Sequence, residues 1–96
     1  MATLFTISAI REDARAHGSH WFDPDTMRFF RSRALSGVMH TSDGAALFVS
    51  SESTPEGPRA YSVRSYRDGR MDTIGEFMGH ATAAQARRAM REHAAR

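Results

Sequence analysis

The spacing of apolar residues predicts a helix over 6–17, near the start of the chain. Apolar side chains recur there at i, i+3 and i+7, the period of one helical face; they are Ile7, Ile10 and Ala14. Gly18 follows as a residue suited to the position just after a helix. The alternative is a strand over 3–8, because this segment is rich in residues that favour strands.

A second, short helix is predicted over about 24–32. Asp23 can accept hydrogen bonds from the free N–H groups of a first helical turn, and Pro24 has the φ that the first helical position needs. A helix of about two to three turns is unstable alone, so its aromatic neighbours need a partner surface. We therefore expect Trp21 to be at least partly buried beside Phe22.

Alternating apolar and polar residues predict a four-stranded antiparallel meander, with strands over 38–41, 45–51, 60–67 and 70–78. Ser-Asp-Gly at 42–44 and Asp-Gly at 68–69 are the predicted hairpin turns. Residues 33–37 are predicted to turn the chain, and the segment 51–59, with two Pro and one Gly, to form an exposed loop. Gly79 is predicted to end the fourth strand.

The third strand has two distinct faces. Because side chains alternate along a strand, Tyr61 and Val63 point to one face, and Arg64 and Tyr66 point to the other. If the first pair faces the core, Arg64 and Tyr66 face solvent. Their exposure is the condition under which they can bind a partner.

The last helix is predicted over about 82–95. Thr82 and Gln85 form a T-x-x-Q capping box at its start. A narrow apolar stripe would pack it on the sheet; its members are Ala83, Ala86, Met90 and Ala94. The predicted fold class is α+β: a four-stranded antiparallel meander with an N-terminal helix, the short helix at about 24–32 and this C-terminal helix.

Composition favours one small α+β domain over residues 1–96. The chain is 41% hydrophobic and 25% charged, as globular proteins are. It has no Cys, which excludes disulfides and Cys-ligated metal sites. No apolar run approaches the roughly 18 residues of a membrane helix, and the first residues lack the basic region and cleavage site of a signal peptide. We therefore expect a cytoplasmic protein with no membrane contact.

Charge is distributed unevenly along the chain. All thirteen basic residues are Arg, and the net charge is +2. Residues 59–70 and 81–96 each carry four Arg and one acidic residue, net +3, whereas 34–58 carry three acidic residues and no basic one, net −3. The sequence therefore predicts a polarised molecule rather than a uniformly basic one.

Candidate catalytic and metal-binding residues are few. His17 and His20 have H-x-x-H spacing, but Gly18 ends the predicted helix between them and no Cys or Glu cluster completes a metal site. Asp23 and Asp25 form a pair of carboxylates whose position at a helix start explains both. No nucleophile elbow or H-E-x-x-H helix occurs. We predict a protein without enzymatic activity, metal or cofactor.

Two groups of residues are the predicted binding sites. The first lies on or beside the hairpin of the third and fourth strands: Arg59, Arg64, Tyr66, Arg67 and Arg70. The second lies on one face of the last helix: Arg87, Arg88 and Arg91. Arginine beside exposed aromatic residues suits phosphate contact and base stacking. The alternative is that the hairpin arginines are solvated and pair with Asp68, Asp72 and Glu76.

The residues FDPDTMRFF-x-SR at 22–33 carry a family resemblance. Together with FVSSES at 48–53, RAYSVRSY at 59–66 and DTIGEF at 72–77, they resemble a family of small uncharacterised proteins encoded by bacteriophages. The resemblance covers roughly residues 21–77, and TMRFF-x-SR is its most specific part. It implies phage origin, small size and a domain of unknown function, and it assigns no catalytic residue.

Three functions are open from the sequence. The first is a phage accessory protein that binds a host protein or nucleoprotein complex, for example to inhibit a host defence complex of the CRISPR type. The second is direct nucleic-acid binding through the hairpin that carries arginine and tyrosine. The third is a small enzyme, which would need a concave site with converging polar groups. A homodimer is also open, because edge strands and exposed aromatic residues can support one.

Overall fold

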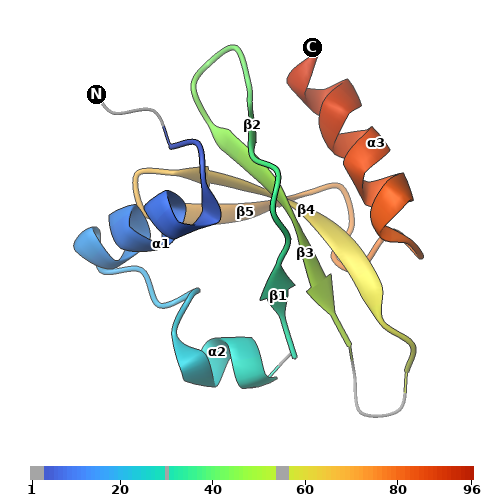
Figure 1. The fold of residues 1–96 in the computed structure, drawn as a ribbon, viewed down its shortest axis with the longest axis horizontal. Coiled ribbons are helices and arrows are strands. Elements are labelled where there is room, and N and C mark those ends of the chain that lie inside the picture. The colour runs from blue at the N-terminus through green and yellow to red at the C-terminus, as the bar shows by residue number, and fades with distance from the viewer. Residues whose placement is uncertain (1–3, 30, 54–56) are drawn as a thin grey trace.

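The computed structural model describes residues 4–29, 31–53 and 57–96. An antiparallel sheet lies between α1 and α2 on one side and α3 on the other (Figure 1). The elements in chain order are α1 (Ile7–Ala16), α2 (Pro24–Phe29), β1 (Arg33–Ala34), β2 (Met39–His40), β3 (Ala46–Glu52), β4 (Ala60–Arg67), β5 (Arg70–Ile74) and α3 (Ala83–Ala94). The predicted α+β fold class is therefore confirmed.

The first helix, α1, follows the predicted period. Thr6 is its N-cap, and the Thr6 hydroxyl oxygen accepts a hydrogen bond from a backbone N–H of the first turn. Its buried residues are Ile10 and Ala14. Gly18 follows at φ +77°, in the left-handed conformation that often succeeds a helix. Residues 4–8 do not form the alternative strand, and Thr3 lies outside the described residues.

The short helix α2 ends at Phe29, before the predicted end near residue 32. Arg31 adopts φ +50°, a left-handed conformation that does not continue a helix. The Arg31 N–H donates to the Arg28 carbonyl at 3.1 Å, and the Ser32 N–H donates to the Met27 carbonyl at 2.7 Å. These two bonds have the Schellman pattern, which satisfies the last carbonyls of the helix and turns the chain toward β1.

The sheet has the strand order β1-β3-β4-β5, and β2 also pairs with β3. All pairs are antiparallel. The strand β4 has the predicted bounds, and the turns predicted at 42–44 and 68–69 join β2 to β3 and β4 to β5. The prediction of antiparallel hairpins is therefore confirmed, with β3 and β4 as the long central pair.

Two boundaries on the N-terminal half of the sheet differ from the prediction. The segment 33–37 was predicted as a turn, but Arg33 and Ala34 form β1 and pair with β3. The strand β3 extends to Glu52, which the sequence placed in the exposed loop at 51–59. Glu52 stays in the sheet because its carboxylate has buried hydrogen-bond partners. Residues 54–56 of that predicted loop lie outside the described residues.

The strand β5 ends at Ile74 rather than at the predicted residue 78, so Gly79 does not terminate it. Gly75 adopts φ +76° and Met78 adopts φ +56°, conformations that an extended strand does not accommodate. The Met78 N–H donates to Ser62 Oγ of β4 at 2.7 Å. The chain after β5 therefore folds back onto β4.

Hydrophobic cores lie on both faces of the sheet. On the α1 side the buried residues are Ile10, Ala14, Phe22, Ala46, Phe48 and Tyr66. On the α3 side they are Leu47, Val49, Val63, Ala86 and Met90. The prediction that Arg64 and Tyr66 face solvent is therefore wrong, because Arg64 is only 8% exposed and Tyr66 only 1%. The alternation was right, but α1 and the Trp21–Phe22 segment cover the second face.

Tyr66 is part of the contact between α1 and the β4–β5 turn. Its hydroxyl donates to Asp13 Oδ2 of α1 at 2.6 Å and accepts a hydrogen bond from the Gly69 N–H at 2.8 Å. Burial, followed by the hydrogen bond to Asp13, raises the pKa of Tyr66 far above its ordinary value. Tyr66 is thus a buried structural residue and is not available for base stacking.

The last helix, α3, has the predicted position and start. Thr82 Oγ1 accepts a hydrogen bond from the Gln85 N–H at 3.1 Å, as in a capping box. The Gln85 side chain accepts from the Ala81 N–H, one residue before the expected donor. Ala86 and Met90 are buried against β3 and β4. Ala94 of the predicted stripe also packs against this core.

Candidate functional site

A buried ion pair lies on the α1 side of the sheet. Arg64 of β4 donates from Nη2 to Glu52 Oε1 at 2.6 Å and from Nε to Ser50 Oγ at 2.9 Å. From Nη1 it donates to Thr73 Oγ1 of β5 at 2.5 Å. The alternation of β3, β4 and β5 points these side chains to the same face. Three strands therefore fix the guanidinium group in one orientation.

The Glu52 carboxylate is fully buried and has hydrogen-bond donors on both oxygens. Ser50 Oγ donates to Oε1 at 2.5 Å, and Ser62 Oγ donates to Oε2 at 3.4 Å. Burying a carboxylate is costly unless it is paired and hydrogen-bonded, and here Arg64 supplies the opposite charge. The network is therefore locally neutral and complete.

The Arg64 guanidinium lies between two aromatic side chains. Its Cζ atom is 5.3 Å from the ring centroid of Trp21 and 5.1 Å from that of Phe77. Such contacts are attractive because the ring face carries partial negative charge. Trp21 is also held edge-on by Phe22 and Phe48, with centroid distances of 4.7 and 5.7 Å. Trp21 is half-buried beside Phe22, as expected, whereas Phe77 is 45% exposed.

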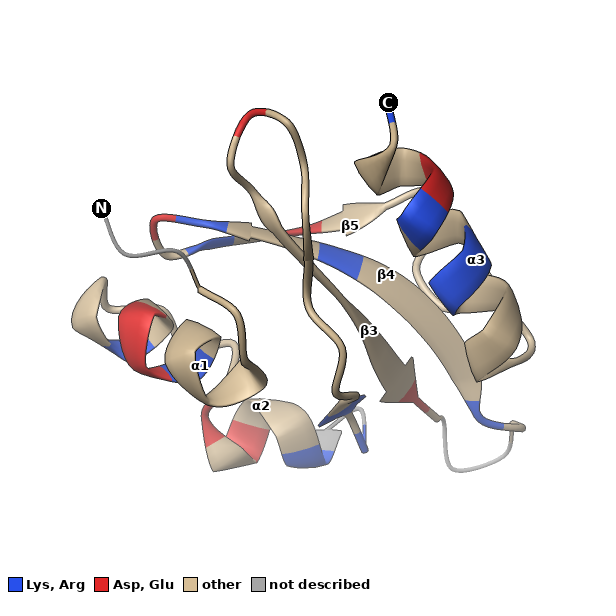
Figure 2. Ribbon diagram, turned by 45° about the horizontal axis from the view of Figure 1, so that its top comes forward, with Lys and Arg blue, Asp and Glu red and all other residues tan. Residues whose placement is uncertain are grey.

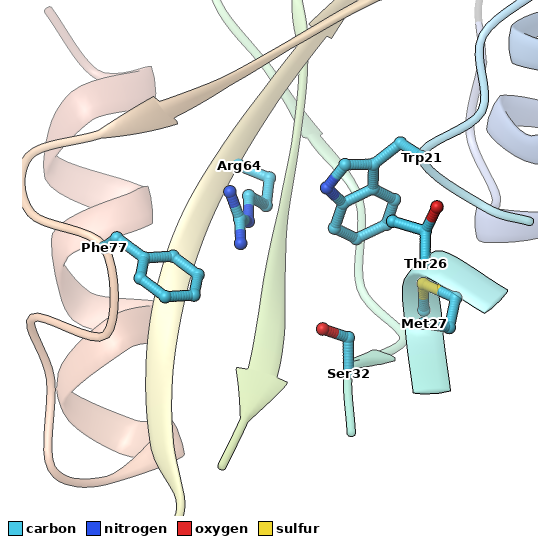
Figure 3. A pocket seen from close by; sticks show the side chains of 6 residues that line it. All are labelled: Trp21, Thr26, Met27, Ser32, Arg64 and Phe77. Atoms are coloured by element: carbon cyan, nitrogen blue, oxygen red, sulfur yellow. The ribbon is translucent and has the colours of Figure 1, made fainter. Parts of the chain in front are cut away.

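These groups form the wall of a pocket of about 260 Å³. Figure 3 shows Trp21 and Phe77 on opposite sides of the pocket, with Arg64 between them and two residues of α2 along one edge. The described residues that line it are Trp21, Thr26, Met27, Ser32, Arg64 and Phe77. The lining is mostly apolar, with one guanidinium and two hydroxyl groups. The pocket therefore suits an apolar group that also accepts a hydrogen bond.

Four arginines lie at the end of α2 and the adjacent end of the sheet, and we call them the basic margin: Arg28, Arg31, Arg33 and Arg59. Arg59 Nη1 donates to the Arg31 carbonyl at 3.0 Å and to Ser51 Oγ at 2.6 Å. Ser51 is also the strand partner of Arg33. Figure 2 shows this basic charge at the C-terminal end of α2, on β1 and at the start of β4. Arg59 thus connects the segments that carry the margin.

The structure does not bring the predicted hairpin residues onto one surface. Arg59 lies before β4, Arg64 is buried in its middle, and Arg67 and Arg70 lie at its other end. Arg67 pairs with Asp43 at 3.2 Å. Arg70 pairs with Asp72 at 3.1 Å, which agrees with the alternative of solvated, paired arginines for this residue.

The second predicted group, Arg87, Arg88 and Arg91, is on α3. This helix packs on the face of the sheet opposite to α1 and α2 (Figure 2). Arg88 and Arg91 are exposed, and Arg87 is half-buried. The arginines of α3 therefore lie on the other side of the sheet from Arg64.

The two histidines with H-x-x-H spacing each lie beside a different carboxylate. His17 Nδ1 lies 3.3 Å from Asp13 Oδ2, and His20 Nδ1 lies 2.8 Å from Asp23 Oδ2. Within the described parts of the chain, no group of three or more His, Asp or Glu side chains is placed to hold a metal ion. In those same parts no helix is both long and apolar enough to cross a membrane.

Two exposed groups have shifted pKa values. A hydrogen bond with the Asp13 carbonyl raises the pKa of His17. A hydrogen bond from the Thr41 hydroxyl, together with the charge of Arg67, lowers the pKa of the Asp43 carboxyl group. Neither group lines the pocket. These pKa shifts therefore arise from local hydrogen bonds at a helix end and a turn, and they do not concern the pocket.

The sequence did not predict that Trp21, Arg64 and Phe77 form a pocket together. Trp21 was predicted to be partly buried, but nothing indicated that Phe77 would lie across Arg64 from it. Phe77 lies beyond the observed end of β5, so strand alternation does not place it. The early end of β5, which places Phe77 there, depends on tertiary contacts.

The fold and the site define a small α+β protein with a two-faced antiparallel sheet and an aromatic pocket built around a buried arginine. Residues 6–91 match the model of a family of unknown function, DUF7447. The match covers most of the chain, which therefore belongs to that family. Comparison with curated proteins and with solved structures gives no match.

Proposed function

We propose that this is a non-enzymatic accessory protein of bacteriophage origin that acts in the host cytoplasm by binding a host protein or nucleoprotein complex. Its FDPDTMRFF-x-SR motif supports the phage origin. Inhibition of a CRISPR-type defence complex is one role of this class. The observation that carries the proposal is the pocket between Trp21 and Phe77.

The composition of the pocket supports a protein partner. Aromatic residues and arginine are enriched at the centres of protein interfaces, where they contribute most of the binding energy. Trp21 and Phe77 are held by Arg64, and Arg64 is held by three strands. A surface that is ordered before binding loses less conformational entropy on association. The pocket is therefore a preformed anchor site.

The lining also supports binding rather than catalysis. The Arg64 guanidinium is already engaged in an ion pair, and the other polar groups of the lining are the hydroxyls of Thr26 and Ser32. Proton transfer at neutral pH needs a group that titrates near that pH. This set of side chains suits holding an apolar group.

The test is capture of host proteins by the immobilised protein, with and without nuclease treatment of the lysate. We expect a stoichiometric host protein that survives nuclease and is lost with Phe77→Ala. Phe5→Ala is the matched control, because Phe5 is an exposed phenylalanine outside the lining. Capture that does not depend on Phe77 would contradict the proposal.

Direct nucleic-acid binding is the second candidate, and the basic margin is the observation that favours it. Arg31, Arg33 and Arg59 are exposed and close together, which suits phosphate contact. This reading predicts an affinity for single-stranded DNA that falls steeply with salt and with Arg31→Glu. Affinity that is indifferent to salt would exclude it.

A further inference from the structure

We propose that the pocket and the basic margin together recognise an acidic segment of the partner protein. A bulky apolar side chain of that segment occupies the pocket, and its neighbouring carboxylates contact the arginines. This inference rests on the proposed function, because it names the chemistry of the partner at the same site.

The pocket and the margin are joined by the chain itself. Met27 and Ser32 line the pocket, and Arg28 and Arg31 are their immediate neighbours in sequence. The left-handed conformation of Arg31 ends α2 at this point. Arg59, which precedes β4, donates a hydrogen bond to the Arg31 carbonyl. The pocket lining and the basic margin are therefore contiguous along the chain.

Within the described parts of the chain, most arginines of the margin have no carboxylate within ion-pair distance. Among the described residues, the carboxylate within ion-pair distance of the margin is that of Asp25, which lies 3.8 Å from Arg28. Among the residues that the structure describes, the hydrogen-bond acceptors of Arg59 are the neutral oxygens of Arg31 and Ser51. Arginine binds carboxylates with two parallel hydrogen bonds, so these side chains complement acidic residues.

The pocket interior selects the anchor. Its volume of about 260 Å³ lies below the roughly 300 Å³ lower end of small-molecule sites, so it suits a single side chain. Arg64 uses three of its five N–H groups within the part of the chain that the structure describes. The other two can donate to an oxygen of the occupant. Because Glu52 neutralises Arg64, the interior itself does not demand an anion.

The same geometry favours a protein segment over a nucleic acid. A nucleobase binds by stacking on an open aromatic face. In this pocket the Arg64 guanidinium lies over both Trp21 and Phe77 and occupies one face of each ring. A compact apolar side chain does not need an open ring face, because it contacts the lining by packing. Acidic side chains can then reach the margin.

The experiment is selection of a random displayed peptide library on the immobilised protein, followed by titration of synthetic selected peptides. Trp21 is the single Trp of the chain and lines the pocket, so its fluorescence reports occupancy. We expect enrichment of peptides in which Asp or Glu flanks an anchor residue. The anchor is expected to be Leu, Phe or another aromatic residue other than Trp. We also expect binding of these peptides to change the Trp21 emission.

Variants separate the two parts of the site. Phe77→Ala is expected to weaken the peptide at least about tenfold, as loss of an interface anchor does. Arg28→Glu combined with Arg31→Glu is expected to weaken it about tenfold, and more at low salt. Arg15→Glu combined with Arg88→Glu is the charge-matched control, because both arginines are exposed and neither lines the pocket.

A further variant covers the case in which Phe77→Ala disturbs folding. Thr26→Phe places a large side chain at the α2 edge of the pocket without removing a contact of Arg64 and without adding a second Trp. It is expected to block the peptide while leaving the thermal unfolding midpoint close to that of the wild type. Peptide binding that survives this filled pocket would overturn the inference.

The outcomes distinguish the inference from the proposed function. Peptides that need Phe77 but show no acidic enrichment, or no effect of the arginine reversals, overturn the acidic segment and leave the protein-binding function standing. A single-stranded oligothymidine that competes with the peptide and changes Trp21 emission replaces the protein segment with nucleic acid. If neither peptides nor captured host proteins depend on Phe77, both proposals fail.

Discussion

At the scale of single residues, Arg64 determines both a structural network and the pocket. Its guanidinium neutralises the buried Glu52 carboxylate on one side and contacts the Trp21 and Phe77 rings on the other. A charged residue with both roles has little freedom to change. Removal of the guanidinium leaves Glu52 without its counter-charge.

We therefore expect Arg64→Ala to lower the free energy of unfolding by about 3–5 kcal/mol, the usual cost of breaking a buried pair. Arg70→Ala is the comparison, because the Arg70–Asp72 pair is exposed and should contribute no more than about 1 kcal/mol. Chemical denaturation of both variants measures the difference. Equal losses would show that the Arg64–Glu52 pair is not buried in solution.

Tyr66 gives a prediction of pH dependence. Its pKa is raised by burial and by the hydrogen bond to Asp13, so the folded chain holds this proton more tightly than the unfolded chain. The stability that this adds is intact below the ordinary pKa of 10.0 and is lost as the pH rises above it. In a Tyr61→Phe variant, the absorbance of tyrosinate should rise only at a pH above 10.0, together with unfolding. Ionisation of Tyr66 in the folded protein near that pH would contradict the buried position.

At the scale of elements, α1 is fixed against the β4–β5 turn by close approach. A Cβ atom added at Gly69 would lie 2.5 Å from His17 Cβ, closer than side-chain atoms pack. Gly69 also has φ +89°, which its Asp-Gly turn requires. The turn and the C-terminal end of α1 can therefore approach each other this closely only because Gly69 has no side chain.

Gly69→Ala should destabilise the fold by about 1–3 kcal/mol more than Gly44→Ala. The two glycines share a positive φ at a hairpin turn, but open space surrounds a Cβ at Gly44. The comparison therefore removes the backbone strain common to both and leaves the contact with His17. Thermal or chemical unfolding provides the measurement. Equal effects would mean that the turn does not contact α1 as closely as the structure shows.

Elements with strong local signals could be predicted from the sequence. Alternation between two turn signals predicted β4 at its observed bounds, and the Thr82 cap predicted the start of α3. Elements that depend on partners could not be predicted. The two-residue strand β1 exists because β3 pairs with it, and Glu52 joins β3 because of Arg64.

The candidate site was only partly predictable for the same reason. The arginines and the partial burial of Trp21 were visible in the sequence, whereas the position of Phe77 was not. The sequence did not show that α1 would cover the face that carries Arg64 and Tyr66. Binary patterning identifies two faces of a strand but does not tell which of them a helix covers.

At the scale of the whole molecule, the sheet separates two surfaces with different properties. The side of α1 and α2 carries the pocket. The basic margin lies at the edge of that side, where Figure 2 shows basic charge on α2 and β1. The α3 side carries the helix with Arg87, Arg88 and Arg91. The pocket brings together segments from residue 21 to residue 77, so its integrity depends on the complete fold.

The most direct measurement is the nuclear magnetic resonance signal of the Trp21 indole N–H, a single peak in this chain, during titration with the captured host protein. The proposed binding mode predicts that the peak shifts or broadens in the wild type and in Phe5→Ala. It also predicts that Phe77→Ala abolishes the change at equal concentrations. A host protein that binds while the Trp21 signal stays unchanged would contradict the assignment of the pocket as the binding site.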